Sequence, residues 1–409
     1  TASGKYTLSG NLNCGVNESG IIVDAYTDNV EIDCLSNEII GDPSSTSTTY
    51  GIRIRGGNDN ITIKNCKVKN FRRGIHFYNS GNARILNSVF YNNNLLGISR
   101  GISLYYNVFN ITIKNTNLSN NSRGIRIERN CDNISVEGVF ITNSTRGIWI
   151  NNSANITIKN NNFIDNSKHI FIEGYTEDVF IDDCEFNQGG YGIYFKDEQI
   201  EKISVKNSQF YNTNYGVFVY YALSNSFINN SLFQNMSTSG IRFESVVGTM
   251  VFNNTFNDSD LSISLSENNT VRLNKFVNNA KIDVSSCYNI TLLNNSLQDV
   301  STTAIDIYSI MSRPQLIKII NNSIINVGEK GVDIRDASNI TIENNYFNNM
   351  STAISTFNMN FSFIQGNTMS QINEYGIYLG LSHNNQIKSN SITASRYGIY
   401  GINISSDVF

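Results

Sequence analysis

The chain has 409 residues, with 30 Lys and Arg against 34 Asp and Glu, and a formal net charge of −4. This balance shows no basic excess of the kind that marks a nucleic-acid binder. No apolar run approaches the roughly 18 residues of a membrane span, and six cysteines in this length are too few for a disulfide-built scaffold. Only 16% of the residues are charged. Asn, about one residue in six, supplies much of the polarity.

Residues 1–50 are predicted to form an N-terminal cap and a first coil that starts near Gly20. The segment KYTLSGNL is typical of a short extra strand. Cys14 and Cys34 flank the first coil, and we expect a disulfide between them if the compartment is oxidising. Because the chain opens at Thr1 without a signal peptide, it resembles a processed extracellular protein.

Residues 51–409 repeat with a period of about 23 residues. The repeated element is Gly-(Ile/Val)-x-apolar. It occurs at Gly51, Gly74, Gly101, Gly124, Gly147, Gly192, Gly216, Gly240, Gly331, Gly376 and Gly398. Weaker copies, which have another residue in place of Gly, fill the gaps. A fixed period of this length indicates a solenoid.

Each repeat contains three short segments of alternating apolar character, bounded by Asn, Ser and Gly, and no segment shows a helical period. One such coil cannot bury its apolar face alone, but stacked coils bury a continuous core. Since the coils vary in length and lack strict hexapeptides, we predict an all-β, single-chain, right-handed parallel β-helix of about 17 coils of about 23 residues each.

A column of Asn residues follows the second strand of many repeats. It consists of Asn65, Asn87, Asn115, Asn160, Asn207, Asn230, Asn294, Asn321 and Asn344. Asn tolerates the left-handed backbone of a tight bend, and stacked amides can bond along the axis. We therefore predict that this column forms a hydrogen-bonded ladder.

The Gly-Ile-x-Ile and NITIKNN-type repeats resemble the right-handed parallel β-helix repeat family from Gly20 to Phe409. This family includes polysaccharide lyases and hydrolases, copper-associated periplasmic proteins, phage tailspikes and microbial surface proteins. The Asn-rich, sequon-rich style looks most like archaeal cell-surface or sheath proteins. Such a resemblance implies the fold and not an activity.

No convergent catalytic group is evident. Polysaccharide hydrolases of this family resemble one another in an Asp pair with a third Asp, a Gly-His-Gly turn and an Arg-x-Lys element. Here none of His76, His169 and His383 lies between two glycines. Asp182 and Asp183 are adjacent, so their side chains point to opposite sides of a strand and cannot act together. An enzyme is possible but unsupported.

Two outward columns are predicted to form an interface for self-assembly. Two residues after each Gly, four consecutive repeats carry Trp149, Phe171, Tyr194 and Phe218, which we expect to form an exposed stripe for protein contacts or for stacking on sugars. Immediately before the Gly lie five successive cations, Arg73, Arg100, Arg123, Arg146 and Lys168, which suit an extended acidic partner. The chain ends at Phe409 without a polar cap, so we expect copies to stack there.

Three acidic residues, Asp283, Asp306 and Asp333, fall in the same column as the aromatic stripe, on successive repeats. Like charges at strand spacing are unfavourable without a counter-charge. The alternatives are a calcium site, a solvated acidic face with raised pKa values, and a contact with the basic column of another copy.

About twenty Asn-x-Ser/Thr sequons suggest glycosylation at solvent-side turns. The predicted sites are Asn60, Asn110, Asn133, Asn155, Asn289, Asn339, Asn120, Asn143 and Asn349. Of the remaining cysteines, Cys66 and Cys184 are expected to be buried free thiols. Cys131 and Cys287 are expected in exposed turns, where intermolecular disulfides are an option.

These patterns predict an extracellular, glycosylated structural protein of the cell surface that assembles with copies of itself into a surface layer, sheath or filament. The alternative is a β-helix protein that binds or cleaves carbohydrate, with cell-surface glycans as partners. No cofactor other than calcium is indicated, and neither a nucleic-acid partner nor a membrane span is expected.

Overall fold

The computed structural model describes residues 2–94, 99–197, 199–221, 223–394 and 396–409. Every regular element in these ranges is a β-strand. A helix long and apolar enough to span a membrane is not found among them. The chain forms two compact units, Thr1–Gln209 and Phe210–Phe409.

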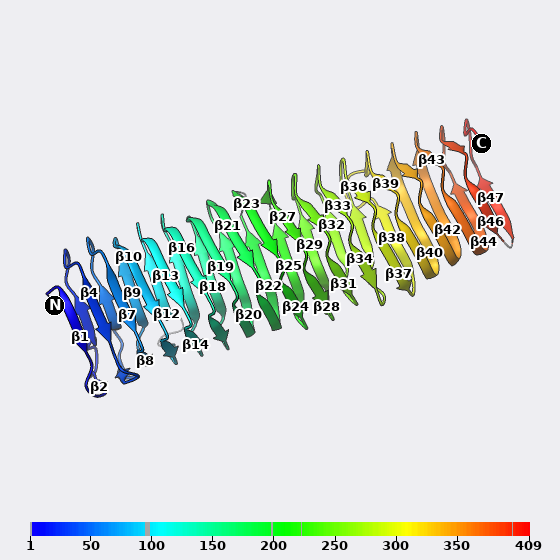
Figure 1. Cartoon of the computed structure of the whole chain (residues 1–409). Coiled ribbons are helices and arrows are strands. Elements are labelled where there is room, and N and C mark those ends of the chain that lie inside the picture. Colours follow the sequence, from blue (N-terminus) through cyan, green and yellow to red (C-terminus); the bar gives the residue numbers. More distant parts are fainter. Residues whose placement is uncertain (1, 95–98, 198, 222, 395) are drawn as a thin grey trace. The chain divides into compact units, whose positions relative to one another are not determined.

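Each coil contains a first, a second and a third strand that pair with their equivalents in the neighbouring coils. In unit 1, β15 (Arg123–Glu128), β16 (Asp132–Glu137) and β17 (Phe140–Thr142) form one coil. They pair in parallel with β18 (Arg146–Asn151), β19 (Ala154–Lys159) and β20 (Asn162–Glu173) of the next coil (Figure 1). This arrangement confirms the predicted three-stranded solenoid.

Unit 1 repeats this pattern throughout. Its other first strands are β3 (Ile21–Val23), β6 (Tyr50–Ile54), β9 (Arg73–Tyr78), β12 (Arg100–Tyr105), the end of β20 and the end of β22 (Glu185–Lys196). Its other second strands are β1 (Gly4–Thr7), β4 (Val30–Asp33), β7 (Ile61–Lys64), β10 (Gly81–Leu86), β13 (Phe109–Lys114), β21 (Thr176–Asp182) and β23 (Ile200–Lys206). Its other third strands are β2 (Leu12–Asn13), β5 (Glu38–Ile40), β8 (Lys67–Lys69), β11 (Val89–Tyr91) and β14 (Asn117–Ser119).

Unit 2 has the same organisation. Its first strands are β25 (Tyr215–Tyr220), β29 (Ser239–Glu244), β32 (Leu261–Ser264), β35 (Ile282–Ser285), β38 (Thr303–Tyr308), β47 (Tyr397–Ile402) and parts of β40 (Ser323–Ser338), β42 (Tyr346–Asn360) and β44 (Thr368–Gly380). Its second strands include β30 (Met250–Phe252), β33 (Thr270–Arg272), β36 (Thr291–Leu293), β39 (Lys318–Ile320) and β41 (Thr341–Glu343). Over the described residues of both units, the first strands agree with about seventeen coils.

The repeated Gly is required where two coils approach closely. A Cβ atom on Gly74 would lie 2.5 Å from the carbonyl oxygen of Gly101 in the next coil, and one on Gly101 would lie 2.8 Å from that of Gly124. Such contacts are closer than a carbon atom tolerates, so the glycine column lets the first strands pack against the core. The side chains that follow it, such as Ile125 and Ile127, are fully buried.

The predicted Asn column is hydrogen-bonded in part, as from Nδ2 of Asn115 to Oδ1 of Asn87 at 3.4 Å, and an internal Asn ladder lies one residue further along the chain. The predicted residues do adopt left-handed backbone, as in Asn344 with φ of 54°, but Asn344 is exposed. The following residue, Asn345, is 1% exposed, and its Oδ1 accepts the backbone N–H of Asn322 at 2.8 Å. Its Nδ2 donates to the carbonyl of Ile319 at 2.8 Å. In unit 2 the same ladder runs through Asn254, Asn274, Asn295, Asn322, Asn345 and Asn367.

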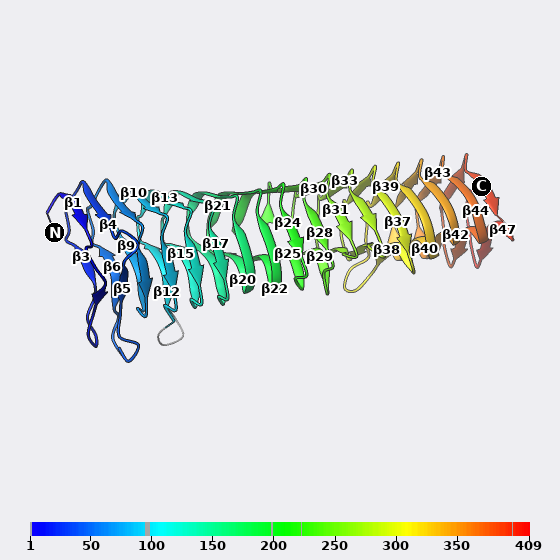
Figure 2. The same ribbon diagram turned by 60° about the horizontal axis from the view of Figure 1, so that its bottom comes forward.

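The cap region is built from ordinary coils with long connecting loops. Strand β1 pairs in parallel with β4, so the predicted extra strand is a regular second strand. The segments that follow β2 and β5 project beyond the strands (Figure 2). Asn17 joins them, because its Oδ1 accepts the backbone N–H groups of Thr46 and Ser47, each at 3.0 Å.

The predicted disulfide partner of Cys34 is wrong. Cys34 is bonded to Cys66 in the next coil, with the two Cα atoms 4.8 Å apart, and Cys14 is a free thiol. Strands β4 and β7 pair in register, which brings the residues after their ends together. Cys131 and Cys287 are free but buried, not in exposed turns as predicted. Burial therefore argues against intermolecular disulfides at these two positions.

We expect replacement of Asn345 by Ala to lower the free energy of unfolding by about 2 kcal/mol, because buried groups in two neighbouring coils lose their partners. Hydrogen exchange should accelerate at the Asn322 amide, whose acceptor is removed. The matched control is Asn344→Gly, which keeps the left-handed bend and leaves this amide bonded. Unchanged exchange at Asn322 in the Asn345→Ala protein would contradict the ladder.

Replacing Cys34 by Ser should destabilise unit 1 by about 3 kcal/mol, since the cross-link closes a long loop in the unfolded chain. Replacing Cys14 by Ser should have little effect on thermal stability. Alkylation of the unfolded, unreduced protein should modify Cys14 and leave Cys34 and Cys66 unmodified. Modification of Cys34 without prior reduction would show that the assigned pair is incorrect.

Candidate functional site

The first strands of unit 1 carry three columns of outward side chains, which together we name the cation–aromatic face. The cation column contains Arg73, Arg100, Arg123, Arg146 and Lys168. The central column contains His76, Ser103, Arg126, Trp149, Phe171 and Tyr194. The strand-end column contains Tyr78, Tyr105, Glu128, Asn151 and Glu173. Strand pairing places the members of each column on successive rungs, as the repeat predicted for the first two.

The aromatic stripe is not exposed as predicted. Trp149 is 7% exposed and Phe171 is 1% exposed. The guanidinium carbon of Arg123 lies 4.0 Å from the centroid of the Trp149 ring, and that of Arg146 lies 4.3 Å from the Phe171 centroid. The cations therefore cover the rings. Of the other two predicted members, Tyr194 is half-buried beside Lys168, and Phe218 is half-buried in unit 2 beside Arg242.

Stacking on aromatic rings explains how like charges occupy successive rungs. The face of an aromatic ring attracts a cation, and this attraction is larger when water is excluded. Arg146 lies between two rings, 4.9 Å from the Trp149 centroid and 4.3 Å from the Phe171 centroid. Lys168 lies 4.7 Å from Phe171 and 4.8 Å from Tyr194. Rings and cations thus alternate along the face.

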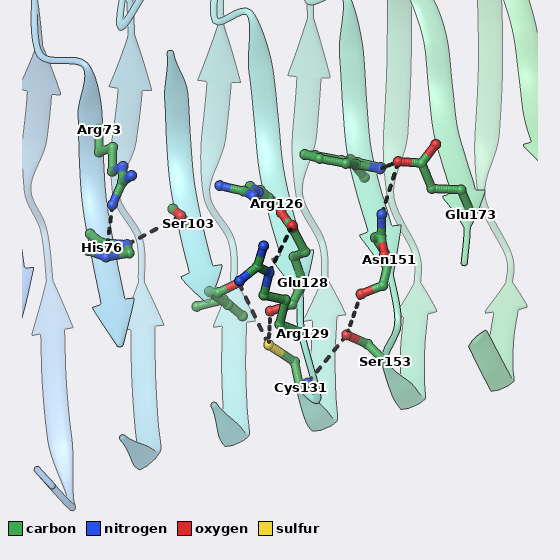
Figure 3. Close-up of polar contacts among 12 residues, drawn as sticks. Arg73, His76, Ser103, Arg126, Glu128, Arg129, Cys131, Asn151, Ser153 and Glu173 are labelled. Carbon is green, nitrogen blue, oxygen red and sulfur yellow. Dashed lines mark hydrogen bonds and ion pairs between the residues drawn. The ribbon is translucent and has the colours of Figure 1, made fainter. Parts of the chain in front are cut away.

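The positive charge of this face is only partly compensated. Glu128 pairs with Arg126 and, at 3.6 Å, with Arg129. Glu173 instead accepts hydrogen bonds from Nε1 of Trp149 at 2.9 Å and from Nδ2 of Asn151 at 3.0 Å (Figure 3). Both glutamates lie in the strand-end column, which the search of the sequence did not include. The column is predictable from the sequence, because its members lie two residues after those of the central column and therefore point to the same side of the strand.

Several guanidinium groups of this face are partly desolvated. The Nε atoms of Arg73, Arg100 and Arg126 are buried and have no hydrogen-bond partner among the described residues. Burial, followed by the charges of Arg73 and Arg123, lowers the pKa of Arg100 to about 9. Arg100 therefore remains a cation at neutral pH. The buried Nε atoms are out of reach of a ligand, but the uncompensated positive charge of the face is suited to an anionic one.

His76 does not act as a general base for Ser103. Its Nε2 lies 2.9 Å from Nη1 of Arg73, and its Nδ1 lies 3.3 Å from Oγ of Ser103 (Figure 3). An arginine can only donate, so Nε2 accepts and the proton resides on Nδ1. Burial, and then the charge of Arg73, lowers the pKa of His76 to about 2. The neutral imidazole therefore positions Arg73 and cannot take a proton from the serine.

The predicted divergence of Asp182 and Asp183 is consistent with the structure. Asp182 is 6% exposed, and its carboxylate lies 3.7 Å from Lys159 and 3.9 Å from Lys206. Asp183 occupies the left-handed bend that follows, with φ of 53°. Asp182 therefore serves as the counter-charge for two lysines on neighbouring rungs.

The acidic column stacks as predicted, but it is neutralised within the chain. Asp283 pairs with Lys281 at 3.1 Å and Asp306 pairs with Arg335 at 2.7 Å. Asp333 pairs with Lys330 at 3.0 Å, a lysine that the sequence reasoning missed.

These ion pairs change the interpretation of the column. No group of three His, Cys, Asp or Glu side chains in the described ranges is arranged to hold a metal ion. Ion pairs give Asp283, Asp306 and Asp333 a counter-charge each, and calcium binding at this column stays a prediction. The same pairs remove the need for a basic partner from another copy.

The predicted glycosylation sites all have left-handed backbone, but four of them fall within strands and not at turns as predicted: Asn110 in β13, Asn133 in β16, Asn155 in β19 and Asn349 in β42. Asn60, Asn110, Asn133, Asn155 and Asn339 are exposed and Asn289 is half-buried, while Asn120, Asn143 and Asn349 are exposed. Several of these amides already donate along the axis, as from Nδ2 of Asn133 to Oδ1 of Asn110 at 2.6 Å. Glycosylation at these positions remains a prediction. Phe409, the last residue of the predicted interface, is 61% exposed.

The family model described as a right handed beta helix region matches residues 1–163, 101–232, 146–316 and 282–407. The chain belongs to this family. Its membership confirms the predicted right-handed parallel β-helix and the resemblance on which that prediction partly rested. No match was found among curated protein sequences.

The chain is similar to several solved structures at low sequence identity. The family 28 exopolygalacturonase of Yersinia enterocolitica is 12% identical, with a TM-score of 0.44 over 80% of this chain and 71% of that chain. The polygalacturonase from Erwinia carotovora ssp. carotovora is 13% identical, with a TM-score of 0.46 over 71% of this chain and 90% of that chain. PfbA, a surface adhesin of Streptococcus pneumoniae, is 14% identical, with a TM-score of 0.35 over 81% of this chain and 84% of that chain. Similarity at this level carries no functional argument for this chain.

Acidification should weaken unit 1 through His76. The unfolded chain takes up a proton at an ordinary histidine pKa near 6.5, whereas the folded pKa is about 2. The unfolded state therefore binds more protons between these values, and stability falls as the pH is lowered below about 6.5. The measurement is the melting temperature of the native protein and of His76→Gln from pH 7 to pH 4. The melting temperature of the native protein should fall more than that of His76→Gln. An equal fall in the two proteins would contradict this prediction.

Proposed function

We propose that this protein binds an extended acidic polysaccharide along the cation–aromatic face of unit 1. The observation that carries the proposal is the stack of five cations, Arg73 to Lys168, on successive rungs with few carboxylates opposite them. Neighbouring rungs are roughly 4.8 Å apart. A polymer with regularly spaced carboxylates or sulfates supplies the counter-charges that this stack lacks.

The buried rings favour a polysaccharide over a nucleic acid. Single-stranded nucleic acids bind by stacking their bases on open aromatic faces as well as by charge. Here Arg123 and Arg146 cover Trp149, and Arg146 and Lys168 cover Phe171. The face therefore offers charge and hydrogen-bond donors rather than stacking surface. The formal net charge of −4 also speaks against a general affinity for nucleic acids.

The proposal places the protein outside the cytoplasm. The Cys34–Cys66 bond supports an oxidising compartment, because structural disulfides are rare in reducing ones. The exposed sequons are compatible with this location. Cell-surface or matrix glycans are the partners of suitable chemistry there.

A self-assembling surface layer, sheath or filament is the less supported alternative. It was expected to pair the cation column of one copy with the acidic column of another. Asp283, Asp306 and Asp333 already pair with Lys281, Arg335 and Lys330. The aromatic stripe that was to provide apolar contacts is largely buried. Binding of an acidic polysaccharide uses the cation column, and it requires neither a free acidic column nor an exposed aromatic stripe.

The test is binding of a uronate homopolymer to the native protein, compared with a neutral glucan and single-stranded DNA. We expect the uronate polymer to bind, with an affinity that falls as salt rises, and the neutral glucan not to bind. Replacing Arg123 and Arg146 together by Gln should weaken binding at least tenfold, because two adjacent counter-charges are removed. The matched control is Arg84→Gln, an exposed arginine on the second strand β10.

Failure of the uronate polymer to bind at low salt would overturn the proposal, and so would an equal loss in the Arg84→Gln protein. Tighter binding of DNA than of the uronate polymer would also overturn it. Sedimentation of the Arg100→Glu, Arg123→Glu, Arg146→Glu protein tests the alternative. A native protein that forms ordered assemblies which this variant abolishes would favour the structural role instead.

A further inference from the structure

A hollow lies at the turn that follows the first strands of unit 1, beside the cation–aromatic face. It has a volume of about 420 Å³ and is lined by Tyr106, Arg129, Asn130, Asn152 and Tyr175. A second hollow of about 250 Å³ shares Asn130, Asn152 and Tyr175. Small-molecule sites in proteins have volumes of roughly 300 to 1,000 Å³.

The backbone at this turn has a left-handed conformation in five successive coils of unit 1. The equivalent residues have φ values of 47° at Asn79, 67° at Tyr106, 65° at Arg129, 48° at Asn152 and 68° at Gly174. Asn and Gly adopt this conformation readily, whereas a bulky residue there costs of the order of 1 kcal/mol. Folding alone would favour Asn or Gly at all five positions. The two bulky residues, Tyr106 and Arg129, both line the hollow, together with Asn152.

The order of large and small residues along this column creates the hollow. Tyr106 and Arg129 are followed by Asn152 and Gly174, and Tyr175, the next residue in the chain, also lines the hollow. Tyr106 and Tyr175 are 41% and 58% exposed, and one face of the Tyr106 ring is stacked on Tyr78 with the two centroids 5.6 Å apart. The floor is held in place, because Oδ1 of Asn152 accepts the backbone N–H of Tyr175 at 2.8 Å.

Arg129 connects the hollow to the cation–aromatic face. Its guanidinium carbon lies 5.1 Å from the ring centroid of Tyr105, and that of Arg126 lies 4.8 Å from the same centroid. In Figure 3, Arg129 lies beside Glu128 and Cys131, where the strands of the face end. Arg129 is the cation among the lining residues; its side chain is 58% exposed, and its Nε lies 3.6 Å from Oε1 of Glu128.

The opposite side of the adjoining hollow is acidic. Asp132 and Glu177 line it together with Ser153. Carboxylates accept hydrogen bonds from hydroxyl groups, whereas the guanidinium of Arg129 binds a carboxylate by donating to both of its oxygens. The two hollows therefore suit a ligand with a carboxylate at one end and hydroxyl groups at the other. Two tyrosine rings suit the apolar face of a pyranose.

We propose that these hollows bind one carboxylated pyranose, a hexuronate residue that ends or branches from the polymer. This proposal rests on the proposed function for its biological setting, but the single sugar is a ligand that can be tested alone. Arg129 holds its carboxylate, Tyr106 and Tyr175 flank its ring, and Asn130 and Asn152 meet its hydroxyl groups.

The experiment is a titration of the full chain with glucuronate and galacturonate, with glucose as the neutral comparison, followed by protein NMR or calorimetry. At least one uronate should bind, and glucose should bind at least tenfold more weakly. Arg129→Asn should weaken uronate binding at least tenfold. Because Asn suits the left-handed turn, this variant should melt at the same or a higher temperature, so a loss of binding is not a loss of folding.

The matched control is Tyr221→Asn, which makes the same kind of change at a left-handed position in unit 2, where φ is 68°. It should leave uronate binding unchanged. Equal affinities for glucose and the uronates, or unchanged binding in the Arg129→Asn protein, would overturn the inference.

The two proposals fail separately. The Arg123→Gln, Arg146→Gln protein should lose the polymer and keep the single uronate. A protein that binds the polymer but no single uronate contradicts only the hollow. A protein that binds the uronate but not the polymer contradicts only the proposed function.

Discussion

The stacking of each residue on its equivalent in the next coil governs this structure. Parallel pairing at roughly 4.8 Å brings identical positions together throughout each unit. An apolar position becomes a continuous core, as in the ring stack of Phe233, Phe256 and Phe276, with centroids 5.0 and 4.5 Å apart. A polar or charged side chain lies next to equivalent polar or charged side chains of the neighbouring coils, so the chain must provide hydrogen bonds or counter-charges for it.

Three solutions to that problem occur. Buried amides bond to one another because an amide both donates and accepts, which makes Asn suitable for an internal column. The aspartates of unit 2 are neutralised by Lys281, Lys330 and Arg335. The arginines of unit 1 instead alternate with aromatic rings, which reduces repulsion without cancelling charge. Only this third solution leaves charge for a ligand, and this difference separates a candidate binding face from a structural one.

The period of the sequence predicted the fold and the strand register. It did not predict side-chain exposure or pairing, which depend on residues in neighbouring columns. The spacing of the glycines predicted the fold and the register. It is informative because a Cβ atom at Gly74 or Gly101 would collide with the next coil, so these coils need a glycine at this position. Exposure of Trp149 was predicted from alternation alone, but long arginine side chains from an adjacent column cover it. The partner of Cys34 depended on where strands β4 and β7 end, and the internal Asn ladder lies one residue after the predicted column. The disulfide partner and the position of the ladder depend on the geometry of the turns. The alternation of apolar residues within short strands does not specify that geometry.

The left-handed turn position has a consequence for how such a protein diversifies. The backbone conformation there is imposed by the coil, so the side chain at that position can change without altering the path of the chain. Asn79, Tyr106, Arg129, Asn152 and Gly174 illustrate how different these side chains are. The side chain at this turn position can therefore differ from coil to coil, and each one can be substituted without changing the others. A solenoid of this kind can acquire new recognition chemistry by point substitution, and grafting a Tyr-Arg pair onto the turns of other coils is a direct engineering route.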